Sequence, residues 1–323
     1  GPYRVGFLPD ALGELREPRE RAHYLVDARV AGLYRKDLKG LLRGPSALRI
    51  VATEKAKSLE RFPAYVRHLV SRGVRRKDVL VAVGGGIVQD IACFLAATLL
   101  RGLEWEFYPT TLLAQADSCI GSKSSINSGG AKNILGTFTP PRRVVIGARF
   151  LATLADEDLR SGVGEMLKVH AIEGPASFDR IAADYPRLFS DRKVMLATIR
   201  RSLEIKKRVI EADEFDRGPR QVMNYGHSFG HAIEAATRFA VPHGIAVTLG
   251  MDLANYASFR LGRSGADSYR RMRPVLARNY RGFERTKVPL APFLDAIGKD
   301  KKNTQARLGL ILPDASGRVA KVE

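Results

Sequence analysis

Three histidines fall within seventeen positions, at His227, His231 and His243, although the chain has only six histidines in all. His227 and His231 are four residues apart, so on a helix their imidazoles share one face. A third imidazole, from the following loop at His243, can converge on the same point. Such a cluster indicates a metal site.

The segment GEMLK offers a carboxylate for this site, because Glu165 and Lys168 are three residues apart and share a helix face. Two imidazoles and one carboxylate leave coordination positions open, which is typical of a catalytic rather than a structural zinc. Histidine pairs on helices are also common as core or capping residues. The spacing alone leaves both interpretations open.

The stretch from Asp117 to Asn133 is rich in glycine and serine and carries Lys123, Asn127 and Lys132. We expect a loop here whose composition suits a phosphate, although loop lysines are often only solvated. The same ambiguity applies to the other candidate anion-binding cations, which are Lys206, Arg220, Lys301 and Lys302.

A strand candidate, Val79 to Val83, leads into Gly84, Gly85 and Gly86 and then into a segment of helical length, Ile87 to Leu100. Glycines let the backbone approach a pyrophosphate, and a helix N-terminus supplies free N–H groups. The triplet is not the GxGxxG fingerprint and also suits a plain tight turn. Upstream, Asp27 ends another strand candidate, where a carboxylate can accept from a ribose hydroxyl, and Glu54 and Lys57 follow the next strand.

Short apolar runs alternate with amphipathic stretches in the first half of the chain. Ala22 to Asp27, Leu48 to Ala52 and Val79 to Val83 predict strands, and Leu59 to Arg72 predicts a helix between them. A last strand is predicted at Val144 to Ile146, and after about Asp156 the periodicity is helical. We therefore expect an α/β Rossmann-like NAD-binding domain over residues 1–153 and an all-α domain that binds metal and substrate over residues 154–323.

The chain has 323 residues, 45% of them hydrophobic, and carries 53 Lys and Arg against 34 Asp and Glu. Its formal charge of +19 suits either nucleic acids or small anions. We expect no nucleic acid partner, because the arginines are scattered over polar helix faces without interleaved aromatic residues. Examples are Arg16, Arg19, Arg21, Arg75, Arg76, Arg270, Arg271 and Arg273.

No apolar run is long enough to span a bilayer, and Asp90 interrupts the nearest candidate. No charged-then-apolar leader follows Gly1 and Pro2, so we expect a cytoplasmic protein without a membrane partner. Cys93 and Cys119 lack the spacing of a zinc or redox motif, and we expect buried free thiols.

Five segments, in this order, resemble the dehydroquinate synthase family of sugar phosphate cyclases. They are GGGIVQD at 84–90, PTTLLAQADS at 109–118, KNILG at 132–136, GEMLK at 164–168 and NYGHSFGHAIE at 224–234. The resemblance runs from about Asp27 to Lys302. It implies a small-molecule sugar phosphate substrate and a homodimer whose active site lies between an NAD domain and a helical domain.

The resemblance also implies roles for individual residues. It implies that Glu165, His227 and His243 bind Zn2+, with Co2+ as an alternative. The implied NAD contacts are Asp27, Glu54, Lys57, Gly84, Gly85, Gly86, Ile87, Asp90, Thr110, Thr111, Leu113 and Lys132. The implied catalytic and substrate residues are Asp117, Lys123, Asn133, Lys168, Asn224, His231, the carboxylate-binding pair Lys206 and Arg220, Arg101 lent by the partner subunit, and Lys301 or Lys302.

The reaction implied for the family converts 3-deoxy-arabino-heptulosonate 7-phosphate to 3-dehydroquinate and phosphate, a step of aromatic amino acid biosynthesis. It proceeds by transient oxidation with NAD, phosphate elimination, return of the hydride and intramolecular aldol closure. No net redox change results, so the cofactor must stay bound through the cycle.

Several positions depart from the family pattern, namely Ser122, Ser124, Ser125, Met223 and Ile245. Ile245 stands where a glutamate normally follows the zinc ligand His243, and its loss is expected to affect the orientation of that ligand. Three alternatives stay open: a secondary-metabolism cyclase acting on an amino analogue or sedoheptulose 7-phosphate (valiolone-type), a metal-dependent alcohol or glycerol dehydrogenase, and a non-catalytic relative that binds a ligand or nucleic acid.

Overall fold

The computed structural model of the chain describes residues 3–299 and 308–322. Lys301 and Lys302, for which a catalytic role is predicted, lie outside the described residues. Two units can be distinguished from the contacts within the chain, Gly1–Leu154 and Ala155–Glu323.

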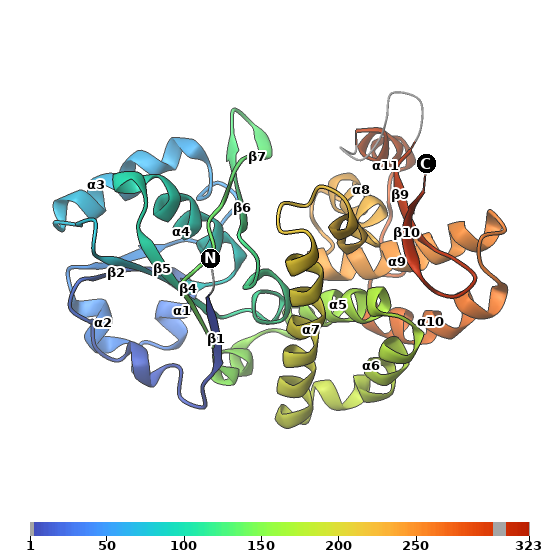
Figure 1. The fold of residues 1–323 in the computed structure, drawn as a ribbon, viewed down its shortest axis with the longest axis horizontal. Coiled ribbons are helices and arrows are strands. Elements are labelled where there is room, and N and C mark those ends of the chain that lie inside the picture. Colours follow the sequence, from blue (N-terminus) through green and yellow to red (C-terminus); the bar gives the residue numbers. More distant parts are fainter. Residues whose placement is uncertain (1–2, 300–307, 323) are drawn as a thin grey trace. The chain divides into compact units, whose positions relative to one another are not determined.

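The first unit is built on a parallel sheet with strand order β1-β8-β5-β4-β2-β3 (Figure 1). The predicted parallel sheet is confirmed, and β2 has the predicted bounds. The apolar runs do not predict β1 and β5, and β5 carries Glu104 and Glu106, which interrupt its hydrophobic pattern. The strands are β1 (Arg4–Phe7), β2 (Ala22–Asp27), β3 (Ala47–Ile50), β4 (Val79–Gly84), β5 (Glu104–Pro109) and β8 (Arg143–Ile146).

The chain turns from β2 outward to β3 and then crosses back to β4, so the connection reverses direction between β2 and β4. The crossovers place α1 (Ala28–Leu33) and α2 (Lys39–Arg43) on one face and α3 (Phe62–Ser71) and α4 (Gly86–Thr98) on the other (Figure 1). Open α/β sheets bind ligands at the carboxyl ends of the strands at such a reversal. Here those ends carry Asp27 and Gly84.

The prediction of a loop between Asp117 and Asn133 is wrong for most of this segment. A π-helical turn (Ala114–Ser118) is followed by an antiparallel hairpin of β6 (Lys123–Ser128) and β7 (Ala131–Phe138). Gly129 and Gly130 form the turn with φ of 56° and 81°, a conformation that glycine adopts without strain. β6 is rich in serine, and β7 has its apolar residues Ile134, Leu135 and Phe138 without strict alternation, so no apolar alternation marks the hairpin in the sequence.

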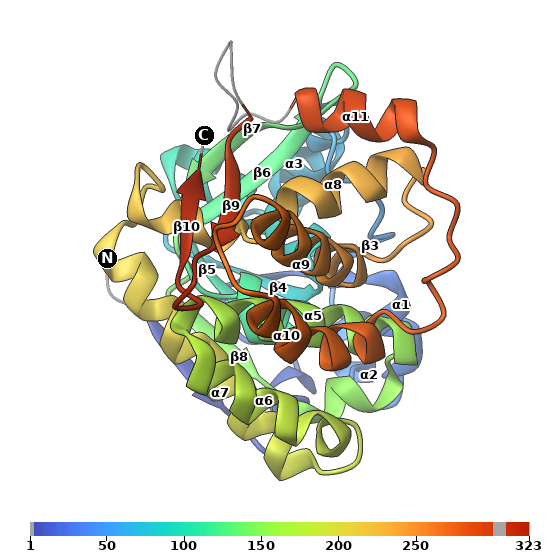
Figure 2. The same cartoon turned by 90° about the vertical axis from the view of Figure 1, so that its right-hand side faces the viewer.

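The second unit is mainly helical, as predicted, and α9 packs between α8 and α5 (Figure 2). An antiparallel ribbon of β9 (Leu310–Pro313) and β10 (Val319–Val322) adds to the helices and was not anticipated from the sequence pattern. The helices are α5 (Asp156–Glu173), α6 (Pro175–Leu188), α7 (Arg192–Ala212), α8 (His227–Ala236), α9 (His243–Arg260), α10 (Ala266–Asn279) and α11 (Leu290–Gly298).

In the described part of the chain, none of the helices combines the length and the apolar character that crossing a membrane would need. Cys93 in α4 and Cys119 are buried free thiols, as predicted.

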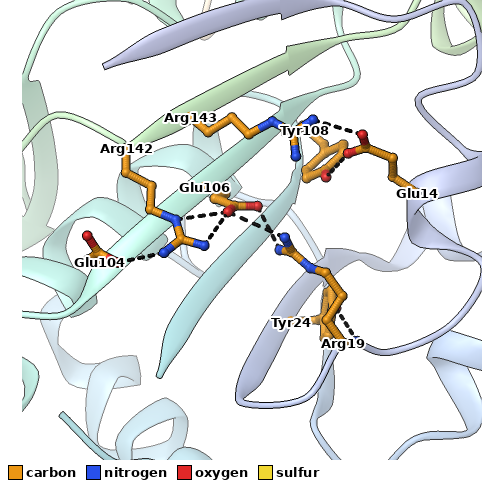
Figure 3. A network of polar contacts seen from close by, with 8 residues as sticks. All are labelled: Glu14, Arg19, Tyr24, Glu104, Glu106, Tyr108, Arg142 and Arg143. Carbon is orange, nitrogen blue, oxygen red and sulfur yellow. Dashed lines mark hydrogen bonds and ion pairs between the residues drawn. The ribbon is translucent and has the colours of Figure 1, made fainter. Parts of the chain in front are cut away.

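Glu106 on β5 is the centre of a polar network in the first unit and is only 2% exposed (Figure 3). Its carboxylate accepts hydrogen bonds from Arg142 at 2.7 and 2.9 Å and from Arg19 at 2.6 Å. Burial raises the pKa of Glu106, but the two guanidinium groups outweigh burial and hold the pKa below its ordinary value. The buried charge therefore ties the segment before β2 to the sheet.

His170 on α5 predicts a pH dependence of stability. It is 2% exposed, and burial lowers its pKa from 6.5 to about 4. The unfolded chain binds this proton below about pH 6.5 and the native state only near pH 4, so stability falls as the pH falls through this window. The contribution is about 1.4 kcal/mol per pH unit, roughly 3 kcal/mol in full.

Urea unfolding between pH 7 and pH 4 is expected to show a shallower loss of stability for His170→Gln than for the unchanged chain. Because other groups titrate equally in both proteins, the difference between the two curves isolates His170. Parallel curves would contradict a neutral buried imidazole.

Candidate active site

Glu165, His227 and His243 come from three different helices and meet at one point. Glu165 lies in α5, while His227 and His243 are the first residues of α8 and α9. Nε2 of His227 is 3.7 Å and Nε2 of His243 is 3.5 Å from Oε1 of Glu165. His243 thus begins a helix rather than lying in a loop.

In an imidazole, the hydrogen-bond partner of Nδ1 determines whether Nε2 carries a hydrogen or a lone pair that can bind a metal ion. Nδ1 of His227 lies 3.2 Å from the carbonyl oxygen of Tyr225, which can only accept, so Nδ1 carries the hydrogen. The lone pair of His227 Nε2 then faces the Glu165 carboxylate, which is also an acceptor. Two acceptors in this position require a cation near them, and two imidazoles with one carboxylate fit a divalent metal ion.

The ionisation of the cluster agrees with this donor set. Burial raises the pKa of Glu165, but Lys168 and the two histidines outweigh it and hold the pKa well below its ordinary value. Burial, with Lys168, lowers the pKa of His227 well below 6.5. Burial also lowers the pKa of His243, but Glu165 and Glu234 outweigh it and raise the value to about 10. The two carboxylates therefore favour a cation at His243, and a metal ion bound at Nε2 would displace the proton that these carboxylates stabilise.

Lys168 lies beside the cluster, as its three-residue spacing from Glu165 predicts. Its Nζ is 2.5 Å from Oε2 of Glu165, and the two side chains are only 3% and 2% exposed. Removing either partner of an ion pair this deeply buried would leave an uncompensated charge, so Lys168 and Glu165 depend on each other.

His231 lies one turn beyond His227, and the expected shared helix face is confirmed. The ring centroids of these two residues are 5.1 Å apart, and the possible ligand atoms of His227, His231 and His243 all lie within 4.8 Å of one another. Unlike the other two imidazoles, His231 is exposed. This exposure is compatible with the predicted contact to substrate.

Glu234 was not among the predicted site residues, yet its Oε2 lies 3.1 Å from Nδ1 of His243. The signal was present in the sequence, because His227, His231 and Glu234 follow one another at helical spacing on α8. Ile245 itself is fully buried in α9. His243 therefore has an acidic partner in Glu234, although position 245 carries an isoleucine.

Glu234 yields a prediction about metal affinity. Glu234→Ala is expected to weaken Zn2+ binding about 10- to 100-fold, because the His243 ring loses the acceptor that orients it. Glu234→Gln keeps an acceptor oxygen and should lose less. Competition with a chelator of known affinity measures both, and Glu211→Gln, an exposed change on α7, is the control. Equal affinity for all three variants would contradict this role.

Lys206 and Arg220 are buried cations on neighbouring elements of the second unit, 8% and 7% exposed. α7 carries Lys206, and a 3-10 turn (Pro219–Asn224) carries Arg220 and Asn224. These elements pack on α5 through Val169, Ile205 and Met223, so Met223 fills the core. Nη1 of Arg220 donates to the carbonyl of Glu214 at 2.6 Å, and Nδ2 of Asn224 donates to the carbonyl of Gln221 at 3.2 Å.

In the glycine turn of the first unit, Gly84 and Gly85 leave room for backbone only, whereas Gly86 has open space around its Cβ position. A Cβ on Gly85 would lie 2.9 Å from Cγ2 of Thr111, and a Cβ on Gly84 would lie 2.6 Å from Cγ2 of Val88 and 3.3 Å from Cβ of Asp27. Gly85 is the N-cap of α4 and provides no side-chain cap. The first N–H groups of α4 therefore remain available to an anion beside Asp27 and Thr111.

Four of the predicted residues form one polar cluster in this unit. Lys57 Nζ lies 2.9 Å from both Oδ2 of Asp90 and Oδ1 of Asn133. The backbone N–H of Ser125 donates to Asp90 at 3.2 Å, so the serine that departs from the family pattern still contributes through its backbone. Glu54 joins through Asn127, which donates to Glu54 Oε2 at 2.9 Å and accepts from the Asn133 N–H at 2.9 Å.

The other predicted residues occupy different parts of the first unit. Lys123 and Lys132 are exposed on the hairpin, and Arg101 is exposed at the end of a 3-10 turn with φ of 65°. Thr110 donates its backbone N–H to Gly84 at 2.9 Å. Ile87 lies in the first turn of α4, Leu113 precedes the π-helical turn, and Asp117 lies within it.

A parallel sheet with a glycine turn in one unit and an imidazole–carboxylate cluster in the other define a class of metal-dependent α/β enzymes. Residues 47–161 match the model of the 3-dehydroquinate synthase N-terminal domain, and residues 162–303 match that of its C-terminal domain. The chain belongs to the 3-dehydroquinate synthase family.

Two similar proteins carry the same family name. The 3-dehydroquinate synthase of Roseobacter denitrificans is 36% identical over 326 residues, covering 97% of this chain and 88% of the relative. That of Dictyoglomus thermophilum is 36% identical and covers 100% and 91%. Among solved structures, the 2-epi-5-epi-valiolone synthase ValA of Streptomyces hygroscopicus subsp. jinggangensis 5008, with NAD+ and Zn2+ bound, is 27% identical with a TM-score of 0.84 and covers 100% and 92%.

Proposed function

We propose that the chain is a 3-dehydroquinate synthase, an NAD- and metal-dependent lyase that converts 3-deoxy-arabino-heptulosonate 7-phosphate to 3-dehydroquinate and phosphate. The observation that carries the proposal is the convergence of Glu165, His227 and His243, in a chain whose relatives carry that activity. When bound at these residues and at the glycine turn, Zn2+ would supply Lewis acidity and NAD a reversible hydride acceptor.

The chain's own residues would bind and orient the substrate. Lys206 and Arg220 are buried cations, and a guanidinium matches a planar carboxylate with two parallel hydrogen bonds, so they would hold the carboxylate of the substrate. Asn224 and the exposed His231 would contact its hydroxyl groups. Lys168 would keep Glu165 ionised and so preserve the metal site when the substrate is bound.

The exposed Lys123 and the amide of Asn133 would contact the substrate phosphate, and holding that phosphate fixes the direction in which it departs. Lys57 keeps Asn133 and Asp90 in place through the two 2.9 Å contacts described above. Asp27, Glu54, Gly84, Gly85, Gly86, Thr110, Thr111 and Lys132 would bind the dinucleotide. Because no net oxidation occurs, these contacts must retain it through the whole cycle.

We also propose a cytoplasmic homodimer in which Arg101 of one subunit reaches the substrate of the other. The side chains of Leu100 and Arg101 are exposed, and both residues have left-handed backbone conformations, with φ of 54° and 65°. Size-exclusion chromatography with light scattering would test the dimer. Mixing Arg101→Ala subunits with subunits inactivated at Glu165 should restore part of the activity if the arginine acts across the interface.

The direct test is phosphate release with product identification. The purified enzyme is incubated with NAD and Zn2+ and, in parallel, with 3-deoxy-arabino-heptulosonate 7-phosphate, sedoheptulose 7-phosphate or glycerol. We expect phosphate and 3-dehydroquinate from the first substrate only, without accumulation of NADH. Turnover of sedoheptulose 7-phosphate alone would favour a valiolone-type cyclase, and NADH from glycerol would favour a dehydrogenase.

A further inference from the structure

The first unit contains a cavity of about 770 Å³ at the end of the sheet where its strands begin. Ser46, Ala22 and Asp78 line it, and these residues lie at the amino ends of β3, β2 and β4. Asp27 and Gly84 lie at the opposite, carboxyl ends of the same strands. The cavity is thus separate from the dinucleotide crevice of this unit.

Cationic side chains outnumber acidic ones along the cavity. Arg72, Arg75, Arg76 and Lys77, in the turn between α3 and β4, are all exposed, and within the described part of the chain none of them has an ion-pair partner. The expectation that Arg75 and Arg76 belong to scattered helix faces is wrong, because the fold collects them in one loop. Uncompensated cations around one concave surface create a positive potential that attracts anions.

The other two arginines of the lining are held in place by buried carboxylates. Asp78, whose side chain is 8% exposed, accepts from the backbone N–H of Arg75 at 2.8 Å and from Nε of Arg21 at 3.4 Å. Since Asp78 uses Nε of Arg21, the two terminal nitrogens of that guanidinium can still donate to a ligand. Arg19 is fixed by Glu106 (Figure 3).

His23 is the buried imidazole of the cavity lining and is only 6% exposed. Nε2 of His23 lies 3.3 Å from Oδ2 of Asp78, whereas its Nδ1 is buried and has no hydrogen-bond partner among the described residues. Because the Asp78 carboxylate can only accept, Nε2 carries the hydrogen, and Nδ1 of a neutral His23 is an acceptor that would pair with a protonated phosphate oxygen.

We propose that this cavity is a second anion-binding site, which takes a small anion of the polyphosphate class. Its volume lies within the range of small-molecule sites, and arginine guanidinium groups match phosphate oxygens with paired hydrogen bonds. The lining residues, all described, include no Phe, Tyr or Trp on which a base could stack, so a single nucleic acid strand is the poorer match. A concave site with several fixed cations favours a compact ligand with several charges.

Calorimetric titration with inorganic tripolyphosphate at low ionic strength tests the site. We expect saturable binding that Arg72→Gln/Arg76→Gln weakens at least tenfold. The matched charge control, Arg263→Gln/Arg270→Gln, changes two exposed arginines of the second unit and should leave the affinity unchanged within about twofold. Lys123→Gln/Lys132→Gln should also leave it unchanged, which separates this site from binding at the proposed catalytic phosphate contacts.

A second readout does not depend on the variants. In histidine side-chain 15N NMR spectra of the unchanged protein, tripolyphosphate should shift the Nδ1 signal of His23. Equal loss of affinity in all three double variants would show a general charge effect and overturn the proposal. Tighter binding of a single-stranded DNA oligonucleotide than of tripolyphosphate, lost in the same Arg72/Arg76 variant, would replace it with a nucleic acid surface.

Discussion

Glu165→Gln is expected to lower phosphate release by roughly a thousandfold, which corresponds to about 4 kcal/mol of lost transition-state stabilisation. The substitution keeps the size of the side chain but removes the charge that faces Nε2 of His227 at 3.7 Å and Nε2 of His243 at 3.5 Å. A neutral amide is a poor ligand for a divalent ion beside two imidazoles. When a chelator is added in steps, the variant should therefore lose its bound metal first and its activity as a consequence.

Metal content by mass spectrometry and phosphate release, measured on the same samples, check this prediction. Because Lys168 loses its buried partner as well, circular dichroism must show that the variant remains folded under the assay conditions. Glu157→Gln, an exposed change on the same helix, is the matched control and should retain both metal and activity. A folded Glu165→Gln variant with full metal content and unchanged turnover would refute the assigned ligand.

The second large effect is expected at Gly244, which follows the candidate metal ligand His243. A Cβ at Gly244 would lie against the backbone carbonyl of Ser161, and a Cβ at Gly164 would lie against the carbonyl of Gly244, in both cases closer than atoms can approach. α5 and α9 thus touch backbone to backbone beside Glu165 and His243. One hydrogen bond strengthens the contact, since the Gly244 N–H donates to Ser161 Oγ at 2.9 Å.

Gly244→Ala is expected to lower the free energy of unfolding by about 3 kcal/mol, because rigid backbone must move to admit the methyl group. Separation of the helices should also move His243 away from Glu165 and weaken Zn2+ binding about tenfold or more. Urea unfolding and chelator competition measure the two effects. Gly32→Ala, in α1 with open space around its Cβ, should be neutral or about 0.5 kcal/mol more stable. If Gly244→Ala behaves like Gly32→Ala, the helix contact does not position the ligands.

α8 also packs closely against α9, and glycine again allows the close approach. A Cβ at Gly250 of α9 would meet the carbonyl of Gly226, the N-cap of α8, and Gly226 itself has φ of 77°. His227 begins its helix directly after this left-handed residue. The ligands that head α8 and α9 are thus held by helices that approach one another at glycines.

Local sequence patterns were enough to predict several features. The four-residue spacing of His227 and His231 places them on one helix face wherever that helix lies, because helical geometry repeats every 3.6 residues. The strand–glycine–helix pattern around Gly85 is likewise local and is confirmed in β4 and α4. The hairpin at β6 and β7 was not predicted, because β6 is mostly polar and the apolar residues of β7 do not alternate strictly with polar ones.

The amino-acid sequence by itself determined the parallel strands around the glycine turn, the helical second half, the shared helix faces and the residue types that can bind metal, phosphate and dinucleotide. Only the tertiary structure decided the distances between Glu165, His227 and His243, the contact of Glu234 with His243, and the gathering of Arg72, Arg75 and Arg76 around one cavity with Arg21 and His23. The physical reason is that these contacts join residues far apart in the chain. Their distances depend on how closely helices and strands pack, and no local spacing records that packing.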